Sequence, residues 1–420
     1  MDTKELLGIE YRPRITDRSI ASALEISGGI VLEGARGCGK TMSGAHHARS
    51  AILLDDPDSE ILMSIDPSAA LSGDSPRLVD EWQLHPEVWN LTRRAIDRAG
   101  HPGQFILTGS SVPNDDITRH TGAARFLRIP MHTLTWAEKQ RGHSPAVRFE
   151  SLVNGVKPAT DPEVEPLGTA VELLLRSGFP AHRNATPDQS LRLLRGYINE
   201  VSRTDVSRLA EIRHEPMVIE QLMSAIARNS AEETSITTLR KDLLSIAPDL
   251  SLATVARYVE LLERLFIVEK QPAWTPRLQS RARLRTSPKY HLVDPALAAA
   301  ALNADETLLM REPTLLGSLF ESAVVHDLTV MTEALGGTVH HFRDSNGYEM
   351  DAVCVLPGGR WAGIEVKLGG RLIVPGAERL AQVAAVIEQP PVFLAVITAT
   401  GPTLTFPSGV HTFPLARLGM

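Results

Sequence analysis

The stretch Gly34–Thr41, which reads GARGCGKT, decides the fold that we expect for the first third of this chain. It follows the apolar run Gly29–Leu32 and fits the pattern G-x-x-x-x-G-K-[ST] at every fixed position. Its glycines allow a tight turn in which backbone N–H groups wrap a phosphate chain. A helix starting near Gly39 would point its N-terminal dipole at the same anion. The stretch therefore predicts a nucleotide-binding loop made by Gly34, Ala35, Arg36, Gly37, Cys38, Gly39, Lys40, Thr41 and Met42.

Two side chains of this loop have the chemistry that a triphosphate requires. Lys40 is expected to reach the β- and γ-phosphates and to assist their reaction, and Thr41 offers a hydroxyl to Mg²⁺. The loop thus predicts ATP and Mg²⁺ as the cofactors.

Adjacent acids follow about 40 residues later, in Arg77–Gln83, which reads RLVDEWQ. A short apolar run ends at Asp80 and Glu81. In a nucleotide hydrolase the first acid holds Mg²⁺ and the second orients the attacking water. We therefore expect Asp80 to join Thr41 at the metal and Glu81 to act in catalysis.

A further strand, Gln104–Leu107, runs into the polar sequence Thr108-Gly109-Ser110-Ser111. Ligands bind outside the carboxyl ends of parallel strands, so Thr108 or Ser110 is expected to touch the γ-phosphate or the attacking water. Arginines follow at 119, 125 and 128, and Arg125 is our candidate for stabilising transition-state charge, within the chain or across a subunit interface.

Composition limits the classes of function. The chain has 420 residues, a net charge of −7 and two cysteines, Cys38 and Cys354, which rules out a disulfide framework. No apolar run is long enough for a membrane span or a signal peptide, so the sequence predicts a cytoplasmic protein without a membrane partner. Because the chain is acidic overall, contact with nucleic acid would need a local basic patch.

The middle of the chain contains one such patch. Residues 236–270 are expected to form helix, turn, helix and strand, with Ser251 capping the second helix. Between 270 and 289 six basic residues occur without an acid: Lys270, Arg277, Arg281, Arg283, Arg285 and Lys289. Residues 251–289 are therefore the predicted place for contact with DNA, although the same arrangement also serves protein–protein interaction.

In the last third, Asn346-Gly347 lies between two strand-like runs, which is a strong signal for a hairpin. The second run carries Asp351, and the next strand carries Glu365 and Lys367 on one face. Glu321 lies on the preceding helix. Together these residues resemble the PD-(D/E)XK nuclease core, in which carboxylates bind Mg²⁺ and the lysine activates water. The alternative is a retained fold with a structural ion-pair cluster.

The set GARGCGKT, RLVDEWQLHPEVWN, GQFILTGSS and TRHTGAARFLRIPMHTLTWAEK resembles the prokaryotic AAA-type ATPases that carry a C-terminal domain of unknown function. The resemblance extends from about residue 10 to the C-terminus. It implies an α/β P-loop sheet with helices on both faces, followed by a helical and winged-helix region and an α/β restriction-endonuclease-like domain. The implied divisions are an ATPase domain (1–140), a linker (141–169), a helical region (170–230), a winged helix (231–287) and a nuclease-like domain (288–420).

The expected function is a Mg²⁺-dependent ATPase whose nucleotide state is coupled to the C-terminal module and which acts on DNA. Two alternatives stay open. One is an ATP-regulated DNA nuclease, and the other is a nucleotide-switched binding protein or regulator with negligible turnover, which acts on DNA through the winged helix. A protein partner or a homo-oligomer is also open.

Overall fold

The computed structural model describes residues 8, 10–110, 122–140, 142, 144–206, 216–276, 284 and 286–420. The chain divides into two compact units. Unit 1 comprises residues 1–133 and 264–266, and unit 2 comprises residues 134–263 and 267–420. Among the helices in the described ranges, none combines the length and the apolar character needed to span a membrane.

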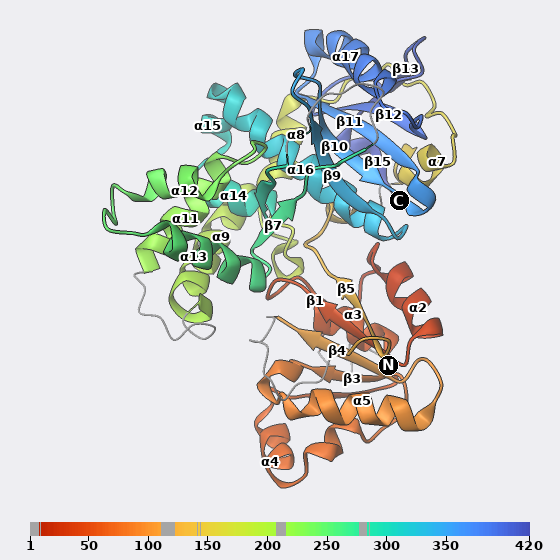
Figure 1. The fold of residues 1–420 in the computed structure, drawn as a ribbon, viewed down its shortest axis with the longest axis vertical. Coiled ribbons are helices and arrows are strands. Elements are labelled where there is room, and N and C mark those ends of the chain that lie inside the picture. The colour runs from red at the N-terminus through yellow and green to blue at the C-terminus, as the bar shows by residue number, and fades with distance from the viewer. Residues whose placement is uncertain are drawn as a thin grey trace. The chain divides into compact units, whose positions relative to one another are not determined.

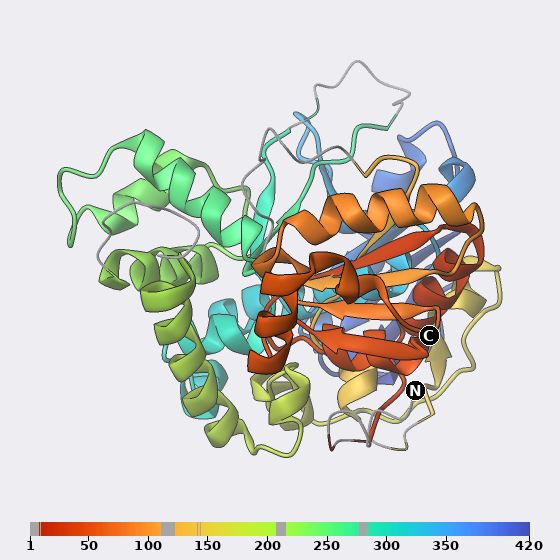
Figure 2. The ribbon, with the colours of Figure 1, turned by 90° about the horizontal axis from the view of Figure 1, so that it is seen from below.

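Unit 1 is built around five parallel strands in the order β2-β3-β4-β1-β5 (Figures 1 and 2). Its elements are α2 (Asp17–Ile26), β1 (Gly29–Glu33), α3 (Lys40–His47), β2 (Ser50–Leu53), α4 (Pro57–Ile65), β3 (Arg77–Asp80), α5 (Glu87–Ala99), β4 (Phe105–Gly109) and β5 (Phe126–Pro130). Strand β4 lies between β1 and β3, so the polar end of β4 separates the phosphate loop from the adjacent acids.

Helices cover both faces of this sheet, because alternate residues of each strand point to opposite sides. Ile30 of β1 belongs to a buried cluster that includes residues of α2 and α3. The next residue, Val31, belongs to a second buried cluster that includes residues of α4 and α5. The predicted parallel α/β sheet with helices on both faces is therefore confirmed.

Unit 2 begins with a helical layer. Its elements up to residue 311 are α6 (Trp136–Lys139), β6 (Val147–Arg148), α7 (Phe149–Val153), α8 (Leu167–Leu175), α9 (Pro187–Glu200), α11 (Pro216–Arg228), α12 (Ile236–Leu243), α13 (Leu252–Arg264), β7 (Val268–Gln271), β8 (Lys289–Leu292), α14 (Pro295–Ala301) and α15 (Glu306–Arg311). Helix α14 is rich in alanine and buried, which lets α8, α9 and α11 approach it closely.

A mixed sheet completes unit 2, in the order β13-β14-β12-β11-β10-β9. Its elements are α16 (Pro313–Glu333), β9 (Thr338–Arg343), β10 (Glu349–Val355), β11 (Trp361–Lys367), α17 (Ile373–Ala385), β12 (Phe393–Thr398), β13 (Leu404–Thr405), β14 (His411–Pro414) and the short β15 (Leu418–Gly419). The predicted hairpin at Asn346-Gly347 is present, because β9 and β10 pair in antiparallel fashion on either side of it.

Helices α16 and α17 lie on opposite faces of this sheet. Val353 of β10 packs in the cluster that contains the buried residues of α17. Its neighbour Cys354 contacts Thr332 of α16, and adjacent residues of a strand point to opposite faces. The C-terminal α/β sheet expected from the sequence is thus present.

The segment predicted to be a linker, 141–169, is instead packed into unit 2 over its described part. Strand β6 pairs with β15, and the buried Phe149 meets the ring of Phe393 edge-on at 6.0 Å. Arg417, which is 5% exposed, places its guanidinium Nη1 2.6 Å from Asp161 Oδ2. The first boundary between the compact units falls after residue 133, and the expected domain divisions stay predictions.

Candidate functional site

The phosphate loop joins β1 to α3 in unit 1. Gly37 and Gly39 have φ angles of 82° and 106°, which side chains disfavour. A Cβ atom on Gly34 would lie 2.1 Å from the carbonyl oxygen of Met131. These three glycines are therefore required by geometry, as the sequence pattern predicted.

Lys40 lies inside this loop and is 4% exposed. Its Nζ donates to the carbonyl oxygens of Gly34 and Ala35, at 2.8 and 3.0 Å. Arg14, which sequence analysis missed, supports the loop from outside by donating to the carbonyl oxygens of Cys38 and His132 at 3.0 and 2.9 Å. A basic residue before the first helix carries no local signal of this role.

Asp80 ends β3 and faces the first turn of α3. The hydroxyl of Thr41 donates to both its carboxylate oxygens, at 2.9 and 3.1 Å, and the buried Thr108 hydroxyl donates to Oδ1. Burial raises the pKa of Asp80 to about 6, and these hydroxyls oppose the rise. No Lys or Arg in the described ranges pairs with this carboxylate. Oxygen ligands and an uncompensated carboxylate are what Mg²⁺ prefers, so Thr41 and Asp80 fit the predicted metal site.

Glu81 follows with φ 52° and ψ 43°, a left-handed conformation that is uncommon outside glycine. Its N–H donates to the Thr108 hydroxyl at 3.1 Å, which holds this conformation. Its carboxylate accepts from the hydroxyl of Ser110 at 3.1 Å and from the amide of Gln83. Of the two sensor candidates, Ser110 contacts Glu81 and Thr108 contacts Asp80. Gln83 was missed, although it belongs to the quoted RLVDEWQ.

Arg125 does not reach this site within its own unit. Its carbonyl oxygen accepts from Gly29 N, at the start of β1, whereas the loop follows the end of β1. The five residues of β1 therefore separate the Arg125 backbone from the phosphate loop by roughly 15 Å. The Arg125 side chain pairs with Asp97 at 2.9 Å. This geometry does not support a role for Arg125 within its own chain, and a role across a subunit interface stays a prediction. Arg128 pairs with Glu33, and Arg119 lies outside the described residues.

A second polar cluster lies in unit 2, where β10 and β11 separate. Their pairing ends at Ala352 and Ile364, and β10 has a register shift between Met350 and Val353. Asp351 lies in this irregularity, and its Oδ2 accepts from the Val366 N–H at 2.7 Å. The carboxylate thus satisfies a backbone donor that the ladder has left unpaired.

Glu365 and Lys367 lie beside Asp351 on the face that Gly376 of α17 covers. Lys367 Nζ donates to Glu365 Oε1 at 2.5 Å, and Glu365 Oε2 is buried without a hydrogen-bond partner. Burial, followed by the charge of Asp351, raises the pKa of Glu365 to about 7. Burial alone would lower the pKa of Lys367, but Glu365 and Asp351 outweigh it and raise that pKa.

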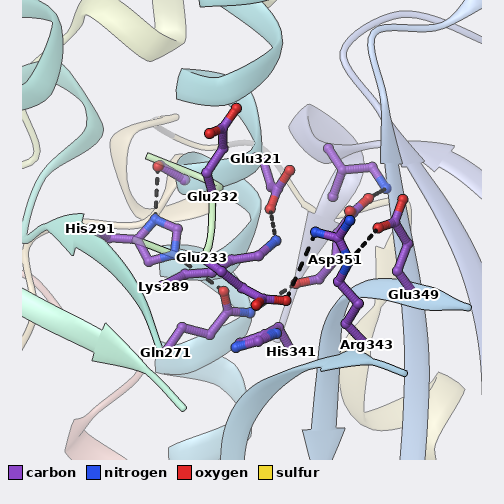
Figure 3. A network of polar contacts seen from close by, with 12 residues as sticks. Glu232, Glu233, Gln271, Lys289, His291, Glu321, His341, Arg343, Glu349 and Asp351 are labelled. Carbon is purple, nitrogen blue, oxygen red and sulfur yellow. Dashed lines mark hydrogen bonds and ion pairs between the residues drawn. The ribbon is translucent and has the colours of Figure 1, made fainter. Parts of the chain in front are cut away.

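Glu321 reaches the cluster from α16, on the other face. Its Oε1 accepts from Lys289 Nζ of β8 at 2.7 Å (Figure 3). Burial, followed by the charge of Asp351, raises the pKa of Glu321 to about 8, and Lys289 opposes this rise. Lys289, Glu321 and Asp351 line a pocket of about 470 Å³ together with Ala231, Glu232, Glu233, His341, Phe342, Arg343, Glu349 and Met350.

The four predicted residues of the nuclease-like set are therefore brought together, with Lys289 as an addition. In the described part of the chain, no group of three or more His, Cys, Asp and Glu side chains has the arrangement of a metal site. Lys289 belongs to the stretch predicted to contact DNA, and its side chain is largely buried in an ion pair with Glu321.

The rest of that basic stretch gives no exposed patch among the described residues. Lys270 pairs with Glu263 at 2.7 Å, and the arginines at 277, 281, 283 and 285 lie outside the described residues. A winged helix requires a helix, a short strand, two helices and two further strands in chain order. The chain has this order in α11, the backbone β-bridge of Glu233 with Lys289, α12, α13, β7 and β8. The winged helix itself stays a prediction.

Comparisons with family models match only domains of unknown function. Residues 168–308 match one such domain (DUF8612), and residues 316–418 match another (DUF4143). An uncharacterized protein of Mycobacterium tuberculosis and one of Mycobacterium bovis are each 25% identical over 394 residues, which covers 92% of this chain and 78% of each relative.

Two solved structures are similar at low identity. A Walker-type ATPase of Pyrococcus abyssi is 14% identical with a TM-score of 0.40, covering 68% of this chain and 94% of that one. The ORC1 protein of Aeropyrum pernix, solved in complex with DNA, is 12% identical with a TM-score of 0.26, covering 74% of this chain and 94% of that one.

Proposed function

We propose that unit 1 binds ATP with Mg²⁺ and hydrolyses it. The observation that carries this proposal is the convergence of Lys40, Thr41, Asp80, Glu81 and Ser110 from three segments at one end of a parallel sheet. The right residue types meet where ligands of such sheets bind.

Each group has a defined task. Lys40 exchanges its hydrogen bonds with the loop carbonyls for bonds with the β- and γ-phosphate oxygens. Thr41 and Asp80 would hold Mg²⁺, which neutralises charge on the phosphates when bound. Glu81 orients a water molecule toward the γ-phosphorus and takes up its proton as the bond to the β-phosphate oxygen breaks, and Ser110 holds the Glu81 carboxylate.

Binding and hydrolysis should separate in two variants. Lys40→Ala should lose ATP binding by at least about tenfold, because a charge-assisted contact is removed. Glu81→Gln should keep binding and lose hydrolysis by about a hundredfold or more. ATP binding and phosphate release are measured for both, with the exposed Lys157→Ala and Glu60→Gln as matched controls. Hydrolysis that survives in Lys40→Ala would refute the proposal.

We further propose that the nucleotide bound in unit 1 affects unit 2. Nucleotide state in unit 1 controls the α11–β8 region and the C-terminal sheet, and DNA is bound through residues 251–289. Duplex or single-stranded DNA should then raise the rate of ATP hydrolysis. Indifference to DNA would point to a protein partner or to a homo-oligomer, and tight ATP binding with slow turnover unaffected by Glu81→Gln would point to a nucleotide switch.

The nuclease alternative depends on the cluster in unit 2. The proximity of Asp351, Glu365 and Lys367 supports this alternative, whereas the ion pair of Glu321 with Lys289 does not. If the chain is an ATP-regulated nuclease, Asp351→Ala should abolish Mg²⁺-dependent DNA cleavage and leave hydrolysis of ATP intact.

A further inference from the structure

Lys289 reaches the acidic cluster from outside the C-terminal sheet. It belongs to β8, which pairs with β7, and its side chain crosses to Glu321 of α16 (Figure 3). The Lys289 and Glu321 side chains are 11% and 14% exposed. A buried carboxylate needs a compensating cation, and Lys289 supplies it from within the chain.

The backbone around Lys289 is fixed, so this lysine is unlike a mobile surface lysine. The backbone of Lys289 forms an isolated antiparallel β-bridge with that of Glu233. Next to it, the Thr234 N–H donates to the Pro288 carbonyl oxygen at 3.4 Å. Two residues on, His291 lies 2.8 Å from the Ser322 hydroxyl, next to Glu321 on α16. The partner of Glu321 is thus placed by strand pairing and by buried hydrogen bonds.

Gln271 connects the same strand pair to the strands of the cluster. Its Nε2 donates to the carbonyl oxygens of His340 and Asp351 at 3.0 and 2.9 Å, and its Oε1 lies 3.2 Å from His291 Nε2. The segment after β7 also bonds to β9 along its backbone. The Trp274 N–H donates to the carbonyl oxygen of His341 in β9 at 2.7 Å, and the His341 N–H donates to the carbonyl oxygen of Pro272 at 3.0 Å. The pair β7–β8 is therefore built into the edge of the sheet that carries Asp351.

The cluster carries cations of its own, which balance two of its three carboxylates without a metal. Glu321, Asp351 and Glu365 are accompanied by two ammonium groups, Lys289 and Lys367. A divalent ion on Glu321 Oε1 would lie roughly 2.1 Å from that oxygen, where it would meet the Lys289 ammonium, itself 2.7 Å from the same oxygen. Two cations on this one buried oxygen would repel each other strongly.

We propose that Lys289 is the resident cation of this cluster and excludes a divalent metal ion from the Glu321–Asp351 side. The residues of this chain therefore do not fit the Mg²⁺ that the nuclease resemblance implies, unless Lys289 is withdrawn. The inference concerns unit 2 alone, and it holds whether or not unit 1 hydrolyses ATP.

Binding of Mn²⁺ to the full-length chain tests this inference, measured by electron paramagnetic resonance without nucleotide. All proteins carry Asp80→Asn, so that the predicted ATP site contributes no metal ligand. The parent should bind no Mn²⁺ at the cluster at about millimolar concentration, whereas Lys289→Met should bind one ion at least about tenfold more tightly. Adding Glu321→Gln to Lys289→Met should remove that ion.

Two controls separate charge from folding. Lys289→Arg keeps the cation and should bind no Mn²⁺, and Lys157→Met, at an exposed lysine, should behave as the parent does. If Lys289→Met does not fold, the proposal is tested by Mn²⁺ binding to the parent protein alone. Mn²⁺ binding by the parent that Asp351→Ala abolishes would overturn the proposal, as would Lys289→Met folding with no gain of Mn²⁺.

Discussion

Gln83 is a single residue that connects two groups on which the proposed hydrolysis depends. Its Nε2 donates to the Glu81 carboxylate and lies 3.3 Å from the Ser110 hydroxyl oxygen. Its Oε1 is buried without a hydrogen-bond partner. Gln83 and Ser110 both contact the same Glu81 carboxylate oxygen and each other, so Gln83 is placed to orient Glu81.

We expect Gln83→Ala to lower kcat for ATP hydrolysis roughly tenfold and to leave the KM for ATP unchanged, because a hydrogen bond to a charged group is lost away from the phosphates. Steady-state kinetics check both values. Gln83→Asn keeps the amide on a side chain one methylene shorter, so its kcat should lie between those of wild type and Gln83→Ala. A change in KM alone would mean that Gln83 acts in binding.

A second single residue, His291, makes the free energy of unfolding depend on pH. Burial, with a further contribution from Lys289, lowers its pKa to about 3. The unfolded chain therefore binds a proton near pH 6.5 that the folded chain does not, and stability falls as the pH drops below 6.5. From pH 7 to 5 this residue should reduce the free energy of unfolding by about 2 kcal/mol.

Urea unfolding of wild type and His291→Gln at pH 7 and pH 5 measures this contribution. The variant lacks the titrating ring, so it should lose less stability than wild type over the same interval. Equal losses in the two proteins would show that His291 is not the group responsible.

At the scale of elements, Asp294 joins α14 to the connection between α8 and α9. Its carboxylate accepts from Ala296 N–H at 2.9 Å, as the helix cap, and from Gly178 N–H at 2.6 Å. The side chain is fully buried. Helix α14 contributes little side-chain surface of its own, so its position depends on this cap.

Asp294→Ala should lower the free energy of unfolding of unit 2 by about 3 kcal/mol, because two buried N–H groups lose their acceptor. Asp305→Ala is the matched control, since Asp305 caps α15 in an exposed position and should cost only about 1 kcal/mol. Denaturant midpoints compare the two, and similar losses would argue against a joint role for Asp294.

At the scale of the whole molecule, the proposed coupling makes a prediction about hydrogen exchange. If nucleotide state in unit 1 controls unit 2, amides beyond residue 165 should exchange at different rates in the ATP and ADP states. Deuterium uptake followed by mass spectrometry, with Lys40→Ala as the control, measures this. Identical exchange beyond residue 165 would contradict the coupling.

Local patterns predicted unit 1 well because its site is made by residues close in sequence to strand ends. Gly34–Thr41 and Asp80 needed only their own strands to be placed correctly. Asp56 shows a missed local signal: it caps α4, with Pro57 at the first helical position.

Unit 2 was predicted less well, because its decisive contacts join distant segments. A lysine in a run of basic residues predicts exposure, yet strand pairing turns Lys289 toward Glu321 of α16. The composition of residues 141–169, rich in Pro, Gly, Ser and acids, predicted a linker, and only the tertiary fold supplies β15 and Phe393 as partners of their described part. Contacts of this kind depend on register between elements that no local pattern records.

The pairing of β6 with β15 sets an order on biosynthesis. All five strands of unit 1 lie within residues 29–130, so its sheet can close while the ribosome is still translating unit 2. Val147 and Arg148, by contrast, are made early and must wait for residues 418 and 419 before they gain their strand partner. During that interval the nascent segment around Phe149 lacks Phe393, the ring against which it packs in the folded chain.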